Sequence, residues 1–241
     1  MNAIKKLAKK IFLPKIPMLP EREAMYKKLE GMPLVERSLR YGTELKRVNC
    51  LDMEAAPGVT ETVVKLLESV NSDAAILDYG CGQHQSLYLK KMGFQNLHSC
   101  DVLNFSGPNF TRIDPASRAL PFADRQFDIV IASELLEHIW SPWLLMEEFK
   151  RIAGRRIIIT TPNVVSLQSK KIFSASGYLQ WFEPKDFFYH LSPVFHWQME
   201  EFCKRHGLKL VSTHGNHTVL GLTDNGRPLD YAEALIFDIT L

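Results

Sequence analysis

The chain alternates between two patterns of apolar residues, one typical of buried strands and one of amphipathic helices. Short continuous apolar runs occur at 75–77, 129–131 and 157–159, as in parallel strands that are buried on both faces. The segments 85–92 and 142–153 instead carry the features of helices. Because strands and helices alternate along the chain, the pattern predicts an α/β fold with a mostly parallel sheet and helices on both faces.

Most expected elements lie after residue 58, and one further helix is predicted before it, at 21–31. An Asn225-Gly226 turn between apolar runs indicates a closing antiparallel hairpin. Predicted helices lie at 59–70, 85–92, 142–153 and 193–206, and predicted strands at 75–79, 97–102, 110–113, 127–132, 156–160, 208–211 and 233–241.

Two of these helices have clear start and stop signals in the sequence. Ser141-Pro142 and Ser192-Pro193 each offer an N-cap followed by a first-turn proline. Gly154 and Gly207 lie just beyond the expected helix ends.

Composition places the chain among soluble globular proteins. It has 241 residues, 46% of them hydrophobic and 23% charged, which excludes disorder and low complexity. No apolar run approaches the ~18 residues of a membrane span. The cysteines have no paired short spacing and the N-terminus does not resemble a secretory signal, so we expect reduced thiols and a cytoplasmic protein.

The first 58 residues are expected to form an extension to a domain at 59–241. Within residues 1–13, apolar positions at helical spacing face four lysines, as in a basic amphipathic helix. This segment either makes a peripheral contact with an anionic membrane, or packs on its own domain, or is a solvated arm. The whole chain carries a formal charge of only +2, which does not favour a nucleic-acid partner.

A candidate ligand site follows the first strand of the sheet. The segment 76–82 reads Ile-Leu-Asp-Tyr-Gly-Cys-Gly, and ligands bind beyond the carboxyl ends of strands in open α/β sheets. A nicotinamide fingerprint would have glycine where the chain has Gln85. Asp78 would repel a diphosphate but could accept hydrogen bonds from an ammonium group. The ligand is therefore expected to be cationic.

Two further segments are expected to border the same site. Asp101 ends the second predicted strand, where a carboxylate can accept hydrogen bonds from both hydroxyls of a ribose. The alternative is a turn aspartate. The segment 120–138 supplies a turn, a strand and a polar exit.

These segments together resemble class I S-adenosylmethionine-dependent methyltransferases, in particular the small-molecule O-methyltransferases of ubiquinone biosynthesis. The resemblance implies a Rossmann-like seven-stranded sheet whose last strand is antiparallel, with S-adenosylmethionine as cofactor. The matching pieces are 76–82 with Asp101, 120–138, 157–163 (Ile-Ile-Ile-Thr-Thr-Pro-Asn) and 206–211 (His-Gly-Leu-Lys-Leu-Val).

The resemblance places the glycine-rich turn at the methionine end of the cofactor. It assigns Asp78 and the backbone of Gly80, Cys81 and Gly82 to this end. His84 stands where the family usually has a third glycine, and it would reshape the methionine pocket or bond the carboxylate.

The resemblance also assigns residues from the following strands. Asp101 would hold the ribose, Val102 would flank the adenine and Ser133 would lie beside the methionine portion. Asp114 stands where an acceptor for the adenine amine is expected, although Pro115 after it has no N–H to offer the ring.

Two histidines are candidates for catalysis. Methyl transfer depends mainly on positioning and on exclusion of water, but a hydroxyl acceptor needs a base within hydrogen-bond reach. His138, at the exit of the fourth strand, and His190, in the following insertion, are our candidates for base or substrate contact. A structural role is the alternative for each.

An aromatic-rich insertion at 164–197 follows the fifth strand. Nine of the chain's 25 aromatic residues lie between Phe173 and Trp197. They form either an acceptor pocket for an apolar or lipid-linked molecule or a satellite core.

No metal site is predicted from the sequence. Cys203, His206, His214 and His217 superficially resemble zinc spacing, but a hairpin is not expected to bring all four together. Methylation of nucleic acid is disfavoured because the exit at 133–136 reads Ser-Glu-Leu-Leu, without the prolines of amino-methylating DNA enzymes.

The sequence therefore predicts a methyltransferase that acts on an oxygen, less readily a nitrogen, of a small-molecule or lipid-linked acceptor. The alternatives are a catalytically silent cofactor-binding or protein-interaction module, in which His84 and Pro115 have spoiled the site, and a nucleotide-dependent oxidoreductase.

Overall fold

The computed structural model describes residues 58–80, 84–102, 109–114, 117, 119–186, 190–216 and 228–241. The predicted N-terminal extension and the Asn225-Gly226 turn lie outside these ranges. Within them, no helix has both the length and the hydropathy of a transmembrane span. Cys100 and Cys203 are buried free thiols, as expected, and burial raises the pKa of Cys203 to about 11.

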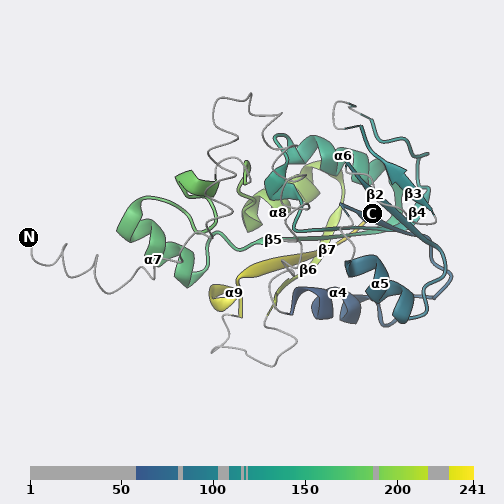
Figure 1. The fold of residues 1–241 in the computed structure, drawn as a ribbon, viewed down its shortest axis with the longest axis horizontal. Helices are drawn as coiled ribbons and strands as arrows, with labels where there is room; N and C mark the ends of the chain where they lie inside the picture. The colour runs from purple at the N-terminus through teal and green to yellow at the C-terminus, as the bar shows by residue number, and fades with distance from the viewer. Residues whose placement is uncertain are drawn as a thin grey trace, which may run out of the picture.

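Seven strands form one mixed sheet in the order β3-β2-β1-β4-β5-β7-β6 (Figure 1). β7 runs antiparallel to both of its neighbours, β5 and β6, whereas the other pairs are parallel. The predicted sheet with an antiparallel last strand is confirmed. The strands are β1 (Ile76–Tyr79), β2 (Leu97–Asp101), β3 (Phe110–Arg112), β4 (Phe127–Ser133), β5 (Ala153–Pro162), β6 (Lys209–Gly215) and β7 (Ala234–Thr240).

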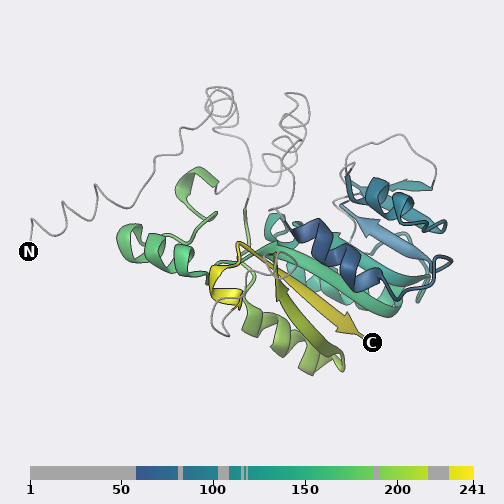
Figure 2. The same cartoon turned by 90° about the horizontal axis from the view of Figure 1, so that it is seen from below.

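Helices cover both faces of the sheet, as predicted. α6 and α8 lie on one face and α4 and α5 on the other (Figure 1), and α7 lies to one side of the sheet in both ribbon views (Figure 2). The helices are α4 (Val59–Leu67), α5 (His84–Lys91), α6 (Pro142–Ile152), α7 (Leu167–Ser176), α8 (His196–His206) and α9 (Pro228–Tyr231), with short 3-10 turns η1 (Leu136–His138) and η2 (Pro184–Asp186).

Successive residues of each central strand enter opposite cores. Ile76 belongs to the cluster that includes α4 and α5 side chains, and Leu77 to the cluster that includes α6 and α8 side chains. Both residues are fully buried. This two-sided burial explains why the central strands have continuous apolar runs.

Two predicted helix boundaries are wrong. β5 begins at Ala153, directly after α6, so that Gly154 lies inside the strand, because Ala153 already pairs with Phe127 of β4. α8 begins at His196 instead of at 193. The backbone N–H of Phe195 donates to the Gln198 side chain, which caps the helix there.

A buried ion pair joins the two central antiparallel strands. The guanidinium of Arg156 on β5 donates through Nε and Nη2 to the two carboxylate oxygens of Asp238 on β7, at 2.6 and 2.8 Å. Its Nη1 donates to the carbonyl of Leu66 on α4 at 2.7 Å. One side chain thus connects two strands and a helix.

Candidate active site

The carboxyl ends of β1, β2 and β4 meet at one edge of the sheet, as predicted from the sequence. Tyr79 of β1 is in register with Cys100 of β2 and with Ala132 of β4. The N–H of Gly80 donates to the carbonyl of Cys100 at 2.9 Å. Gly80 has φ +72°, and a Cβ there would lie 2.9 Å from the Leu135 side chain. Glycine therefore permits both the turn and the close approach of the chain.

Asp78 is buried beneath this edge. Its carboxylate accepts a hydrogen bond of 2.5 Å from the Ser86 hydroxyl on α5, which also contacts the Ser99 hydroxyl at 2.8 Å. Burial raises the pKa of Asp78 to about 7, and the nearby charge of Asp101 acts in the same direction. A cationic ligand beside Asp78 would oppose this shift and favour the ionised carboxylate, so the two neighbouring acids suit a cationic ligand.

Replacing Asp78 with asparagine is expected to change how stability depends on pH. Because the folded pKa of Asp78 lies above its unfolded value, ionisation destabilises the native state as pH rises from about 4 to 7. Asp78→Asn removes this penalty, so its stability gain over wild type should grow across that interval by up to about 4 kcal/mol. Urea unfolding at a series of pH values measures the difference.

The matched control is Asp73→Asn, which changes an exposed aspartate. Its stability is measured beside that of wild type and Asp78→Asn at the same pH values. If the stability difference between Asp78→Asn and wild type did not change with pH, the prediction would be wrong. The Asp78 carboxyl would then have the same pKa in the folded and the unfolded state.

The other predicted cofactor residues occupy the expected elements. Asp101 is the buried last residue of β2, and Ser133 is the half-buried last residue of β4. Val102 is half-buried against the core, whereas Asp114 is exposed. Their contacts with a cofactor stay predictions. Cys81, Gly82 and the side chain of His84 lie outside the described part of the structure.

Two carboxyl groups that sequence analysis did not single out lie at the exit of β4. The Thr160 hydroxyl donates to Glu134 at 2.9 Å, and the Thr161 hydroxyl donates to Glu137 at 3.2 Å. Desolvation raises the pKa of Glu134 to about 7. Burial and the charge of Glu134 raise the pKa of Glu137 well above its ordinary value. The available signal was two glutamates three residues apart, directly after a buried strand.

The two predicted catalytic histidines lie next to each other. The ring centroids of His138 and His190 are 4.9 Å apart. Backbone hydrogen bonds hold them there, because the carbonyl of Glu137 accepts from the N–H groups of Leu191 and Ser192 at 2.7 and 3.1 Å. The fold thus brings together two residues that are 52 positions apart in the chain, and their catalytic role stays a prediction.

The tautomer of neutral His190 follows from its hydrogen bond. Its Nδ1 lies 2.6 Å from the carbonyl oxygen of Trp181, and a carbonyl only accepts, so Nδ1 carries the proton. In the neutral ring, Nε2 then has the lone pair. Trp181 itself has φ +69°, an uncommon conformation for a bulky residue.

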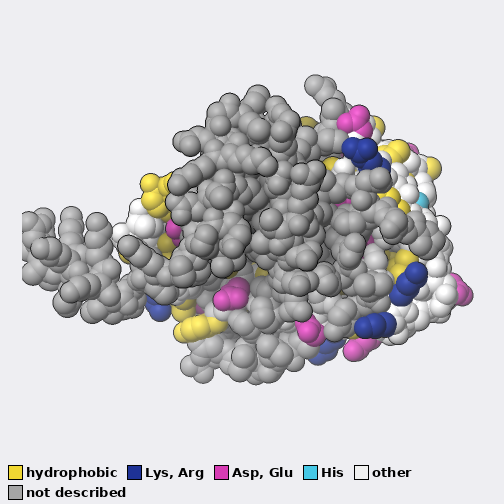
Figure 3. All heavy atoms as spheres, in the orientation of Figure 1, with side chains coloured by type: hydrophobic (Ala, Val, Ile, Leu, Met, Phe, Trp, Pro, Cys, Tyr) yellow, Lys and Arg dark blue, Asp and Glu magenta, His cyan; other side chains and the backbone are white. Residues whose placement is uncertain are grey.

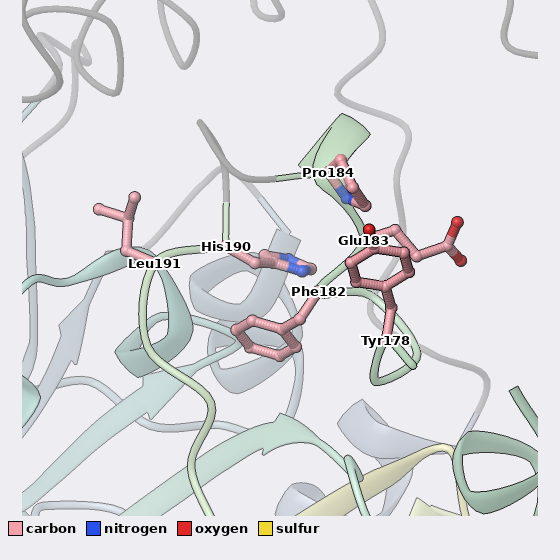
Figure 4. Close-up of a pocket in the computed structure, with 6 residues that line it drawn as sticks. All are labelled: Tyr178, Phe182, Glu183, Pro184, His190 and Leu191. Carbon is pink, nitrogen blue, oxygen red and sulfur yellow. The ribbon is translucent and has the colours of Figure 1, made fainter. Parts of the chain in front are cut away.

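A cavity of about 410 Å³ opens beside His190. In Figure 4 the His190 imidazole and the rings of Phe182 and Tyr178 lie together, whereas Leu191 points away from them. Part of the aromatic insertion therefore forms a pocket, as one of the two sequence interpretations proposed. The lining residues are Tyr178, Phe182, Glu183, Pro184, His190 and Leu191.

The superficial zinc spacing does not correspond to a cluster among the described residues. Cys203 is buried in the core, His206 faces Glu147 at 3.9 Å and His214 bonds the Ser212 hydroxyl. His217 lies outside the described ranges.

Comparison with known proteins relates the chain to one enzyme class. Residues 51–213 match the model of a family described as a methyltransferase domain. No curated protein matches the chain.

Three solved structures of low identity share the fold. A SAM-dependent methyltransferase from Archaeoglobus fulgidus is 17% identical with a TM-score of 0.56, and the match covers 76% of this chain and 93% of the other. The magnesium protoporphyrin IX methyltransferase of Synechocystis with bound SAH is 15% identical with a TM-score of 0.52, covering 90% and 93%. An S-adenosylmethionine-dependent methyltransferase from Mesorhizobium loti is 13% identical with a TM-score of 0.51, covering 79% and 100%.

Proposed function

This chain belongs to the methyltransferase-domain family, and we propose that it transfers a methyl group from S-adenosylmethionine to an oxygen of a small, largely apolar acceptor. S-Adenosylmethionine is the cofactor of this class of enzyme. The αL turn at Gly80 and the buried carboxyls of Asp78 and Asp101 fit a cationic nucleoside. A lipid-linked acceptor belongs to the same proposal, and a nitrogen acceptor is less favoured.

The observation that carries the proposal is the cavity beside His190. Its volume of about 410 Å³ lies within the range of small-molecule sites. Tyr178 and Phe182 provide aromatic walls, and His190 provides a polar group beside them. An apolar molecule with one hydroxyl directed at the imidazole matches this lining.

Proton removal is the chemical task of the two histidines. When bound, the cofactor supplies an electrophilic methyl group on a sulfonium. The acceptor O–H bond breaks as the O–CH3 bond forms, and the electron pair of the S–CH3 bond stays on sulfur. His190 Nε2 accepts the released proton, with His138 beside it. An acceptor bound against the aromatic walls would displace water, which would otherwise compete for the methyl group.

Localisation and partners remain part of the proposal. A cytoplasmic enzyme whose residues 1–13 touch an anionic membrane would have access to lipid-linked acceptors, and sedimentation with anionic vesicles tests that contact. In Figure 3 the described basic and acidic side chains near α4 and α5 are interspersed. This mixture supports a small-molecule partner over a nucleic acid.

The test is transfer of radiolabelled methyl from S-adenosylmethionine to metabolite fractions by the purified full chain. We expect label in an apolar fraction, in a product that resists mild alkali as an ether does. Alkali-labile label would indicate a methyl ester, and label on a basic product would indicate a nitrogen acceptor. Binding of S-adenosylhomocysteine without any transfer would support the silent-module alternative.

A pair of variants then tests the pocket. Phe182→Ala removes a wall of the cavity, whereas Phe173→Ala removes an exposed ring of α7 outside the lining. With the labelled acceptor, Phe182→Ala should raise KM about tenfold, because a buried aromatic contact contributes on the order of 1.5 kcal/mol or more. Equal KM values for the two variants would place the acceptor elsewhere.

A further inference from the structure

We propose that Glu137, His138 and His190 bind a divalent cation of the Mn²⁺, Fe²⁺ or Zn²⁺ type at the acceptor end of the site. One potential ligand atom from each residue lies within 4.8 Å of the other two. The group therefore consists of one carboxylate and two imidazoles. The cation's catalytic role rests on the function proposed above, but the binding site itself does not.

The distances are close to those of a coordination sphere. His138 Nε2 lies 3.8 Å from Glu137 Oε1. Ligand atoms around a tetrahedral ion at ~2.1 Å are roughly 3.4 Å apart. Small rotations of the side chains therefore suffice to close the group around an ion.

His190 and Glu137 have hydrogen-bond partners of the kind that metal ligands commonly have. The Nδ1–H of His190 donates to the carbonyl of Trp181 at 2.6 Å, which directs Nε2 away from that carbonyl. The Thr161 hydroxyl holds Oε2 of Glu137 at 3.2 Å, while Oε1 faces His138. A histidine ligand characteristically donates its second N–H to a carbonyl or carboxylate, and ligating carboxylates are also hydrogen-bonded.

The local charge favours a cation. Glu137 is 1% exposed, and the charge of Glu134 lies close enough to affect it. Within the described part of the chain, neither carboxylate forms an ion pair with lysine or arginine. Buried carboxylates are normally paired or coordinate metals.

Backbone strain occurs on both sides of the group. Glu134 has φ +48° and Trp181 has φ +69°. Such conformations are energetically costly and cluster at functional sites. The first lies at the turn that leads to Glu137 and His138, and the second positions the carbonyl that holds His190.

The donor set indicates both the metal and its use. Two imidazoles and one carboxylate leave open positions and suit first-row transition ions. An acceptor hydroxyl in the adjoining cavity, which His190 also lines, could occupy one of these positions. The cation would lower the pKa of that hydroxyl. With the cation bound, His190 Nε2 is a ligand and no longer the base, so the proton would pass to solvent. The hydroxyl oxygen would attack the methyl carbon, the electron pair of the S–CH3 bond would stay on sulfur, and the metal would not change oxidation state.

This inference departs from the sequence prediction of no metal. The sequence predicts His138 and His190 as separate candidates for base or substrate contact, and it does not distinguish Glu137 from its neighbours. Their convergence depends on contacts between 137 and 190–192, which the sequence pattern does not display.

The experiment is a titration of the chelator-dialysed full chain with Mn²⁺ alone, followed by electron paramagnetic resonance. Mn²⁺ is the probe because it prefers oxygen and nitrogen to the thiolates of the chain's cysteines. We expect one Mn²⁺ per chain, with affinity at least tenfold weaker in Glu137→Gln and in His190→Asn. The matched controls are Glu147→Gln and His206→Asn, which change another Glu–His pair, 3.9 Å apart, and should bind as wild type does.

The outcomes separate this proposal from the methyltransferase function. Binding of S-adenosylhomocysteine checks that each variant is folded, and His138→Asn replaces any variant that fails this check. No saturable Mn²⁺ binding, or wild-type binding in the site variants, overturns the proposed site even if methyl transfer persists. Methyl transfer that is unaffected by chelation overturns the cation's catalytic role. Two results together would support both the site and its catalytic role. The site variants should lose Mn²⁺ binding, and added Mn²⁺ should restore methyl transfer in the chelator-treated wild type but not in those variants.

Discussion

Replacing Asp101 with alanine is expected to weaken S-adenosylhomocysteine binding about 10- to 100-fold. Asp101 ends β2 at the edge where β1 and β4 also end, and its side chain is buried beside the charge of Asp78. Hydrogen bonds from ribose hydroxyls to a charged acceptor contribute about 1.5–3 kcal/mol. Isothermal titration calorimetry of the purified full chain measures the loss directly.

Two variants show whether the effect is specific. Asp73→Ala changes an exposed aspartate outside the site and should bind as wild type does. Asp101→Asn keeps an acceptor oxygen without the charge and should fall between the two. Wild-type affinity in Asp101→Ala would show that the ribose assignment is wrong. A wild-type chain that does not bind S-adenosylhomocysteine would favour the silent-module alternative, with His84→Gly as the first reversion to make.

Replacing Arg156 with methionine is expected to lower the free energy of unfolding by about 3–5 kcal/mol. The Arg156 and Asp238 side chains are 18% and 6% exposed, so the pair is mostly shielded from water. The variant leaves the Asp238 carboxylate buried without its partner and leaves the Leu66 carbonyl without its donor. Chemical denaturation with two spectroscopic probes measures the change.

A double-mutant cycle separates the pair from its surroundings. Arg156→Met combined with Asp238→Asn should recover part of the lost stability, because no buried charge is then left alone. Arg155→Met, which changes the exposed neighbouring arginine, should alter stability by less than about 0.5 kcal/mol. Equal effects of the two single arginine variants would contradict the structural role of the buried pair.

The presence of most strands and their succession along the chain could be predicted because they depend on local patterns, whereas the seven-stranded sheet with an antiparallel last strand was implied by the family resemblance. Continuous apolar runs at 75–77 and 157–159 identify strands that are buried on both faces. Parallel strands connected by helices must end at the same edge of the sheet. The chain order alone therefore places Asp78, Asp101 and Ser133 near one another, as the structure does.

Helix boundaries depended on more than the local capping and proline signals. Ser192-Pro193 has the pattern of a helix start, yet the Ser192 hydroxyl donates to the carbonyl of Ile139 at 2.7 Å and its N–H to the carbonyl of Glu137. These long-range bonds hold Leu191 and Ser192 against the exit of β4. Tertiary contacts thus outweighed a local signal of the kind that normally predicts a cap.

The sequence by itself determined the sheet, the glycine turn and the carboxylates at the strand ends, because periodicity and strand order govern them. Only the tertiary structure decided that Glu137, His138 and His190 form one group with a cavity beside it. That arrangement depends on backbone hydrogen bonds between segments about fifty residues apart and on the Trp181 carbonyl that orients His190. Such contacts cannot be inferred from sequence spacing, because each of them depends on how the insertion packs against the exit of β4.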